Sequence, residues 1–118
     1  MKALDVIGIF DKIRPNSFDY KTKRQWLDCV ETDIRRFAVL HTDENTDTSF
    51  AREENPTLYL DESYMDLYTY YLISMADMSN GEYRMYNISS AYFNSIFDKW
   101  KRIYRGANKP CCNISINL

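Results

Sequence analysis

The fold is decided by residues 60–105, which read LDESYMDLYTYYLISMADMSNGEYRMYNISSAYFNSIFDKWKRIYR. Apolar residues recur there every three or four positions in two successive runs, and this spacing forms one apolar stripe on a helix. The first run consists of Tyr64, Leu67, Tyr68, Tyr71, Leu72, Met75 and Met78. The second run consists of Tyr86, Ser89, Phe93, Ile96, Trp100 and Ile103, widened by Phe97 and Tyr104. We predict helices over residues 61–79 and 82–105, with Asp66, Thr69, Ser74 and Asp77 mostly on the outer side of the first.

A short turn joins these two predicted helices. Asp61 stands where an N-cap carboxylate accepts hydrogen bonds from free backbone N–H groups, and Gly81 supplies the positive φ that commonly ends a helix. Because only residues 79–82 separate the helices, we expect antiparallel neighbours of about 18 to 22 residues each, about 30 Å long.

Two more helices are predicted upstream. A short helix over residues 3–13 ends before Pro15, because proline disfavours helix in the residue that precedes it. A longer helix over residues 19–41 has the apolar set Trp26, Leu27, Val30, Ile34, Phe37, Ala38 and Leu40. Its polar side, which we expect to be exposed, holds Lys23, Arg24, Asp28, Glu31, Arg35 and Arg36. Glu31 and Arg35 are spaced for a helix-surface ion pair worth a few tenths of a kcal/mol. The sequence thus predicts an all-α protein, a small bundle of three long helices plus a short N-terminal helix.

The segment 42–56 is polar, acidic and without a period, and it is longer than most connections in helical bundles. We expect it to be flexible in the isolated chain and to gain order against a partner, because little apolar surface offsets the lost backbone entropy. Phe50 is its only aromatic residue, and two interpretations stay open: an anchor for a partner, or a ring that folds back onto its own domain. Alternating residues at 57–60 and 112–118 predict a minor two-stranded β element, or else a C-terminal tail over 107–118 that is disordered alone.

Composition narrows the class of protein. The chain has 118 residues, 45% of them hydrophobic, which is enough for a single domain over 1–118. Its net charge of -2 argues against a protein that neutralises phosphates over a broad surface. We expect a cytoplasmic protein with no membrane partner, because the sequence shows neither a signal-peptide pattern nor an apolar run long enough for a span. The cysteines, Cys29, Cys111 and Cys112, suit neither a disulfide framework nor a zinc site.

Little in the sequence indicates catalysis. His41 is the only histidine, and it lies at a predicted helix C-terminus, where the helix dipole favours a cation. No Ser-His-Asp or Cys-His arrangement and no clustered transition-metal ligands are recognisable. The acidic residues of segment 42–56 lack the central glycine of a calcium loop. We therefore expect no enzyme, no catalytic residues, no cofactor and no metal.

Aromatic and basic residues indicate binding surfaces instead. Ten tyrosines are more than one small core easily encloses while giving each hydroxyl a partner, so we expect some at a subunit contact. A basic patch near residues 99–105 has two interpretations: contact with nucleic acid, or cations favoured by the helix dipole. The candidate interaction residues are Phe50, Arg52, Tyr64, Tyr68, Tyr71, Tyr86, Lys101 and Arg105.

Several short motifs in this order resemble a known family. They are IRPNSF at 13–18, KRQWL at 23–27, YMDLYTYYL at 64–72, NGEY at 80–83, and the pairs Tyr86-Asn87 and Phe93-Asn94. Together, over about residues 4–105, they resemble the small head-tail connector (adaptor) proteins of tailed phages and prophages of Gram-positive bacteria. The residues 111–112 have no counterpart in that pattern.

The resemblance implies a structural virion protein. Such proteins form a homo-oligomeric ring beneath the portal, join it to tail-completion proteins, and line part of the path of the exiting DNA. They assemble in the bacterial cytoplasm and then belong to the virion. The alternative is a small bacterial regulatory or nucleic-acid-binding helical module that uses the basic patch.

Overall fold

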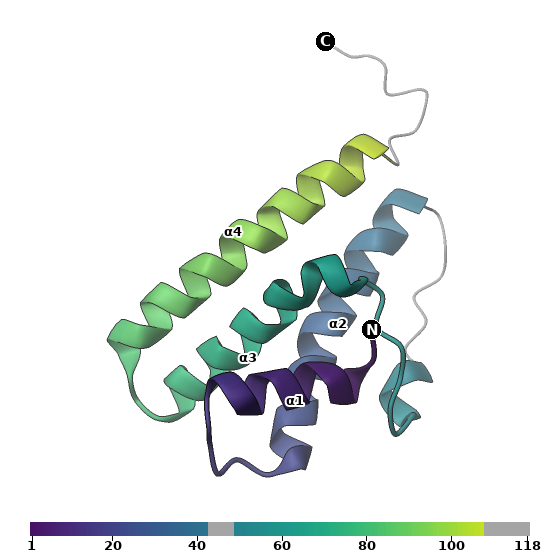
Figure 1. Ribbon diagram of the computed structural model, residues 1–118. Helices are drawn as coiled ribbons and strands as arrows, with labels where there is room; N and C mark the ends of the chain where they lie inside the picture. Colours follow the sequence, from purple (N-terminus) through teal and green to yellow (C-terminus); the bar gives the residue numbers. More distant parts are fainter. Residues whose placement is uncertain (43–48, 108–118) are drawn as a thin grey trace.

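The computed structural model describes residues 1–42 and 49–107, and the described part of the chain is a helical bundle (Figure 1). In chain order the elements are α1 (Ala3–Ile13), α2 (Tyr20–Thr42), η1 (Ser49–Arg52), η2 (Glu62–Tyr64), α3 (Met65–Ser79) and α4 (Tyr83–Ala107), where η marks a short 3-10 helix. The predicted all-α class, with three long helices and a short N-terminal one, is confirmed.

Helix α3 lies at the centre, packed along the longer α4 and also against α1 and α2 (Figure 1). The predicted antiparallel pair is confirmed, and Gly81 ends α3 with a φ of 71°. Asp61 is also a cap, as predicted, because its side chain accepts a hydrogen bond from the Ser63 backbone N–H. It caps η2, however, so α3 itself begins only at Met65.

Side chains from all four α helices form the core. Its largest buried members are Phe10 from α1, Leu27 and Ile34 from α2, Leu67, Tyr68 and Leu72 from α3, and Phe93 and Trp100 from α4. The prediction that α3 has a polar outer side is wrong for Thr69, Ser74 and Asp77, which are buried. The reason is that α1, α2 and α4 surround α3. The hydroxyls bond back to their own helix, from Thr69 to the Met65 carbonyl at 2.9 Å and from Ser74 to the Tyr71 carbonyl at 2.7 Å.

Residues 49–60, here called the strap, begin with η1, lead to η2 and run against the N-terminus of the chain. The Ala3 N–H donates to the Pro56 carbonyl at 3.0 Å, and the Leu58 N–H donates to the Met1 carbonyl at 2.9 Å. The Leu4 N–H donates to Asn55 Oδ1 at 2.9 Å. The strap therefore has ordered backbone partners, and the expectation that all of segment 42–56 is flexible is wrong for residues 49–56. Residues 43–48 lie outside the described part of the chain.

The predicted two-stranded element is not found in the part of the chain that the structure describes. The alternation at 57–60 is real, because Leu58 and Leu60 are buried while Tyr59 is exposed. Thr57 pairs with Lys2 in an isolated antiparallel bridge instead of joining a strand. The proposed second strand, 112–118, lies outside the described residues. The alternation therefore reflects one side packed on the core.

Candidate interaction surface

The polar groups most deeply buried in the bundle already have partners in the chain. Glu31 is 0% exposed, so the prediction that it lies on the outer side of α2 is wrong. Its carboxylate accepts hydrogen bonds from the Tyr68 hydroxyl at 2.6 Å, the Tyr59 backbone N–H at 2.7 Å and Arg35 Nε at 2.7 Å. Burial and the neighbouring Glu31 carboxylate raise the pKa of Tyr68. These contacts join α2, the strap and α3, and they give Glu31 a structural role.

A second buried carboxylate joins α3 to the end of α1 and to α4. Asp77 is 0% exposed and accepts hydrogen bonds from Arg14 Nη1 at 2.7 Å and from Ser89 Oγ at 2.9 Å. The hydrogen bond from its guanidinium to Asp77 raises the pKa of Arg14. Because donors from two other parts of the chain surround it, Asp77 is also a structural group.

The strap is fastened to α2 by arginines that were expected to face solvent. Arg24 is buried, and its guanidinium donates to the Phe50 and Glu54 carbonyls, each at 3.0 Å. The Arg35 guanidinium lies 4.5 Å from the centroid of the Phe50 ring, a cation–π distance. Phe50 is only 2% exposed. Of the two interpretations of Phe50, the structure agrees with a ring that folds back onto its own domain.

The basic patch lies on aromatic rings of its own chain. Lys101 Nζ is 4.4 Å from the Phe97 centroid, and the Arg105 guanidinium is 5.8 Å from the Phe37 centroid. Trp100 and Tyr104 continue this aromatic cluster, with their ring centroids 5.2 Å apart. Cation–π contacts within the chain thus explain the basic residues Lys101 and Arg105, and no ligand is needed to explain them.

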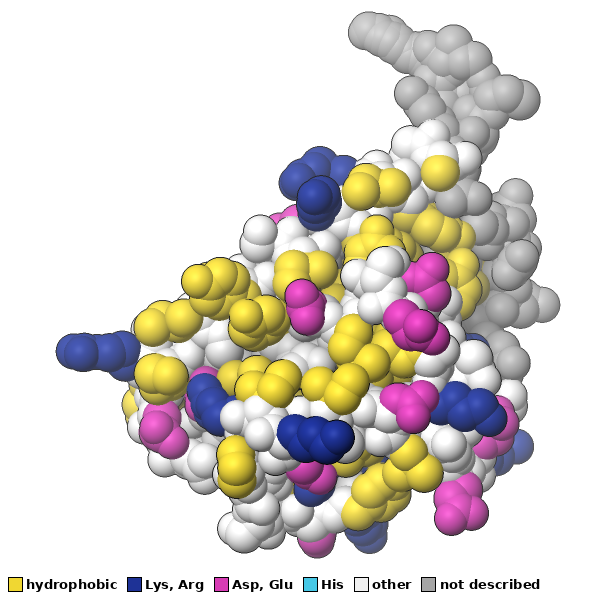
Figure 2. Space-filling view, viewed as in Figure 1, with side chains coloured by type: hydrophobic (Ala, Val, Ile, Leu, Met, Phe, Trp, Pro, Cys, Tyr) yellow, Lys and Arg dark blue, Asp and Glu magenta, His cyan; other side chains and the backbone are white. Residues whose placement is uncertain are grey.

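Helix α4 carries a second apolar stripe that the rest of the described chain covers only in part. Tyr92 stacks on Tyr70 with ring centroids 5.2 Å apart, and Ile96 packs half-buried against the core. The exposed apolar members of the stripe are Met85, Ile88, Tyr92 and Ile103, each between 41% and 54% exposed. With Ile96 and Lys99, which continue the same alternation of three and four residues, they form what we call the outer stripe. Hydrophobic side chains gather over α4 in the space-filling view (Figure 2). The prediction that Ile103 belongs to the core is therefore wrong.

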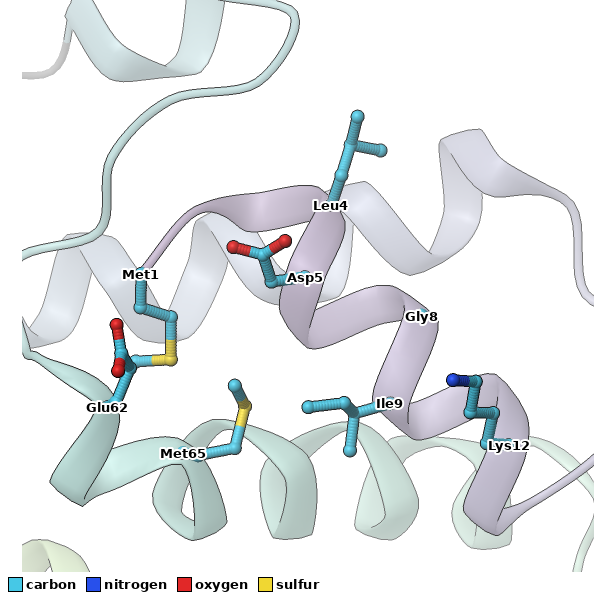
Figure 3. Close-up of a pocket in the computed structure, with 8 residues that line it drawn as sticks. All are labelled: Met1, Leu4, Asp5, Gly8, Ile9, Lys12, Glu62 and Met65. Carbon is cyan, nitrogen blue, oxygen red and sulfur yellow. The ribbon is translucent and has the colours of Figure 1, made fainter.

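Two shallow grooves flank the start of α3. The first, here called the α1 groove, has a volume of about 490 Å³ and is lined by Met1, Leu4, Asp5, Gly8, Ile9, Lys12, Glu62 and Met65 (Figure 3). The second, the α4 groove, has a volume of about 510 Å³ and is lined by Ser63, Tyr64, Asp66, Ser95, Ile96, Lys99 and Ile103. In Figure 3 the side chains of Ile9 and Met65 point toward each other, and Glu62 and Lys12 lie at opposite ends of the α1 groove. The start of α3 thus forms a ridge between two hollows, each lined by apolar and charged side chains.

The structure does not bring the predicted interaction residues together on one surface. Tyr68 is fully buried, so the prediction that it offers a surface to a partner is wrong: its ring fills the core and its hydroxyl is bonded to Glu31. Of the others, Arg52 and Arg105 are exposed, Tyr64, Tyr71, Tyr86 and Lys101 are half-buried, and Phe50 is buried. Burial raises the pKa of Tyr71. The outer stripe was missed, because its spacing of threes and fours overlaps that of the core-facing stripe on the same helix.

The described part of the chain holds no group of three or more histidine, cysteine or acidic residues that could bind a metal ion. None of its helices combines the length and the apolar character that a membrane span needs. The side chain of His41 is outside the description. No protein-family model, curated protein or solved structure matches this chain. Its class, a small all-α bundle, therefore rests on the structure alone.

Proposed function

We propose that this chain is a structural protein of a phage or prophage particle, a head-tail connector (adaptor) that forms a ring between portal and tail. The observation that carries the proposal is the outer stripe of α4. Contiguous apolar side chains exposed on a helix mark a surface that another protein covers. The short motifs of residues 4–105 resemble those of head-tail connector proteins, and this resemblance is the reason for proposing a phage or prophage particle.

The buried acids also favour assembly over acid–base chemistry. Among the residues that the structure describes, Glu31 and Asp77 are the carboxylates with the deepest burial, and each accepts hydrogen bonds from more than one donor of the same chain. A general acid or base needs access to its substrate. Neither carboxylate has any exposed surface, whereas the outer stripe is open along α4.

The alternative, a nucleic-acid-binding helical module, is favoured by the charge of α4. This helix carries Arg84, Lys99, Lys101, Arg102 and Arg105 against a single acid, Asp98. As a connector, the same helix would make transient contact with the exiting DNA. A free regulator would bind duplex DNA tightly, with an affinity that falls steeply with salt concentration.

A joining assay tests the proposal directly. In the phage or prophage that carries the gene, deletion of the gene should yield DNA-filled heads and separate tails, and the purified chain should restore joining in the extract. Genes for portal, capsid and tail proteins should lie beside it. Heads and tails that join normally without the chain would contradict the connector function. Salt-sensitive binding to duplex DNA of any sequence would favour the alternative.

The outer stripe has a matched test within this assay. Ile88→Gln places a polar group on the stripe, and Ile13→Gln does the same at a similarly exposed isoleucine at the end of α1. Both variants should fold, because neither side chain is buried. Joining should fail with Ile88→Gln and persist with Ile13→Gln if the stripe carries the assembly contact.

A further inference from the structure

The outer stripe and the α1 groove match each other in length. Helix α1 has 11 residues, so it spans about 16 Å at 1.5 Å per residue. The part of the outer stripe from Tyr92 to Ile103 has about the same length along the axis of α4. One helix of this length, laid along the groove, would cover the exposed Leu4 and the half-buried Ile9 and Met65.

The two surfaces also match in charge. Two acidic residues, Asp5 and Glu62, line the α1 groove. Lys12, at the end opposite Glu62, is the cation among the lining residues. On α4, the segment from Tyr92 to Ile103 holds the basic residues Lys99 and Arg102 within or next to the outer stripe, together with a single acid, Asp98. An acidic groove wall and a basic helix face attract each other and set the register of contact.

Gly8 opens the middle of the groove. A Cβ atom added there would meet nothing within 4 Å, so the backbone of α1 is bare at this point. Small residues let two helices approach closely, because interaxial distance depends on the side chains at the contact. A helix from a neighbouring molecule can therefore pack closely over Gly8 while its basic side chains reach the acidic residues that line the groove.

We propose that the occupant of the α1 groove is a second copy of this chain, which inserts the segment of α4 from Tyr92 to Ile103. This inference rests on the proposed function and names the two faces of the contact between subunits. The contact joins two different patches, and a contact of this kind repeats around a ring when its rotation closes.

Charge exchange across the contact gives the first test. Glu62→Lys and Lys99→Glu each place like charges opposite one another, and each should weaken self-association of the full-length chain at least about tenfold in sedimentation equilibrium. An equal mixture of the two variants should restore association, because the lysine introduced into one chain then faces the glutamate introduced into the other. Glu53→Lys and Lys21→Glu, at exposed positions outside both surfaces, are the matched controls and should associate as the wild type does.

A disulfide between copies gives the second test. In a background with Cys29, Cys111 and Cys112 replaced by serine, one chain carries Gly8→Cys and another carries Ser95→Cys, an exposed position beside Ile96. Mild oxidation of the mixture should give a product whose mass contains both chains. Ser17→Cys, an exposed serine outside the stripe, is the control for the second chain and should give little product with Gly8→Cys.

The results separate this inference from the proposed function. Self-association that ignores Glu62→Lys and Lys99→Glu, with no cross-linked product between positions 8 and 95, would overturn the contact and place subunit assembly on another surface. A chain that stays monomeric at its highest soluble concentration and gives no such product would overturn it as well. The joining assay tests the connector function independently, since heads and tails that join normally without the chain would contradict that function whatever the cross-link shows.

Discussion

Tyr68→Phe removes one hydroxyl from the buried network around Glu31 while it keeps the aromatic ring. The hydroxyl donates to Glu31 Oε1 at 2.6 Å and accepts from the Leu60 N–H at 3.3 Å. Loss of a hydrogen bond to a charged group costs about 1.5 to 3 kcal/mol, and an unsatisfied buried N–H adds about 1 kcal/mol or more. We expect a total loss of about 3 kcal/mol, a large share of the roughly 5 to 15 kcal/mol typical of a whole domain.

Urea unfolding followed by far-ultraviolet circular dichroism measures this loss. With an m-value of about 2 kcal/mol per molar urea, a change of about 3 kcal/mol lowers the midpoint by about 1.5 M. Tyr92→Phe removes a hydroxyl from an exposed ring and should leave the midpoint within about 0.3 M of the wild type. Equal midpoints for the two variants would refute the idea that the Glu31 network stabilises the bundle.

The same variant has a signature at high pH. The pKa of Tyr68 is raised in the folded state, so its contribution to stability is fully present below the unfolded tyrosine pKa of about 10. That contribution is lost as the pH rises above about 10 toward the folded-state pKa. Stability of the wild type should therefore fall more steeply above that pH than that of Tyr68→Phe, and parallel profiles would contradict this assignment.

Four further substitutions test separate parts of the fold. Trp100→Ala should cost about 3 to 5 kcal/mol in urea unfolding, because it empties a buried site in α4, and an unchanged midpoint would contradict that packing. Gly81→Ala should lower the free energy of unfolding by about 1 kcal/mol, because Gly81 has a positive φ. Gly8→Ala should raise the free energy of unfolding by up to about 1 kcal/mol, because Gly8 lies in mid-helix with open space around it. Changes of the same sign in the two variants would refute this backbone argument. Asp61→Asn should make the fall in the free energy of unfolding at acidic pH less steep. Hydrogen bonds from Ser63 lower the pKa of Asp61, so its contribution is present above the unfolded value of about 3.9 and lost as the pH falls through the folded value; identical acid limbs would exclude it.

Local signals predicted the helices well. The turn at Gly81 is decided by neighbouring residues, so the sequence contains what is needed to place the end of α3 and the start of α4. The cap at Asp61 is also local, but it belongs to η2, and the start of α3 at Met65 was not predicted. The strap was harder, because Phe50 is buried through Arg24 and Arg35, which lie on a different helix. A polar segment is predicted correctly as exposed only when no donor from a distant part of the chain forms hydrogen bonds with its backbone carbonyls.

The buried acids and the outer stripe escaped prediction for different reasons. Glu31 and Asp77 look like surface residues because their partners, such as Tyr68 and Arg14, are far away in sequence. On α4, two stripes lie side by side and overlap in spacing, so Ile103 was assigned to the core when it belongs to the outer face. A helix with apolar residues on two adjacent faces gives one broad pattern, and only a structure separates the two.

The clasp between the N-terminus and the strap has a consequence for the order in which the chain closes during synthesis. Helix α1 leaves the ribosome before the strap, and the partners of the Ala3 and Leu4 backbone N–H groups, Pro56 and Asn55, are made much later. Helix α1 must therefore wait until the strap has emerged, whereas α3 and α4 can pair as soon as both are made. Helix α1 thus docks only after the strap has been made, and we expect α1 and the strap to open together as one unit when the folded protein fluctuates.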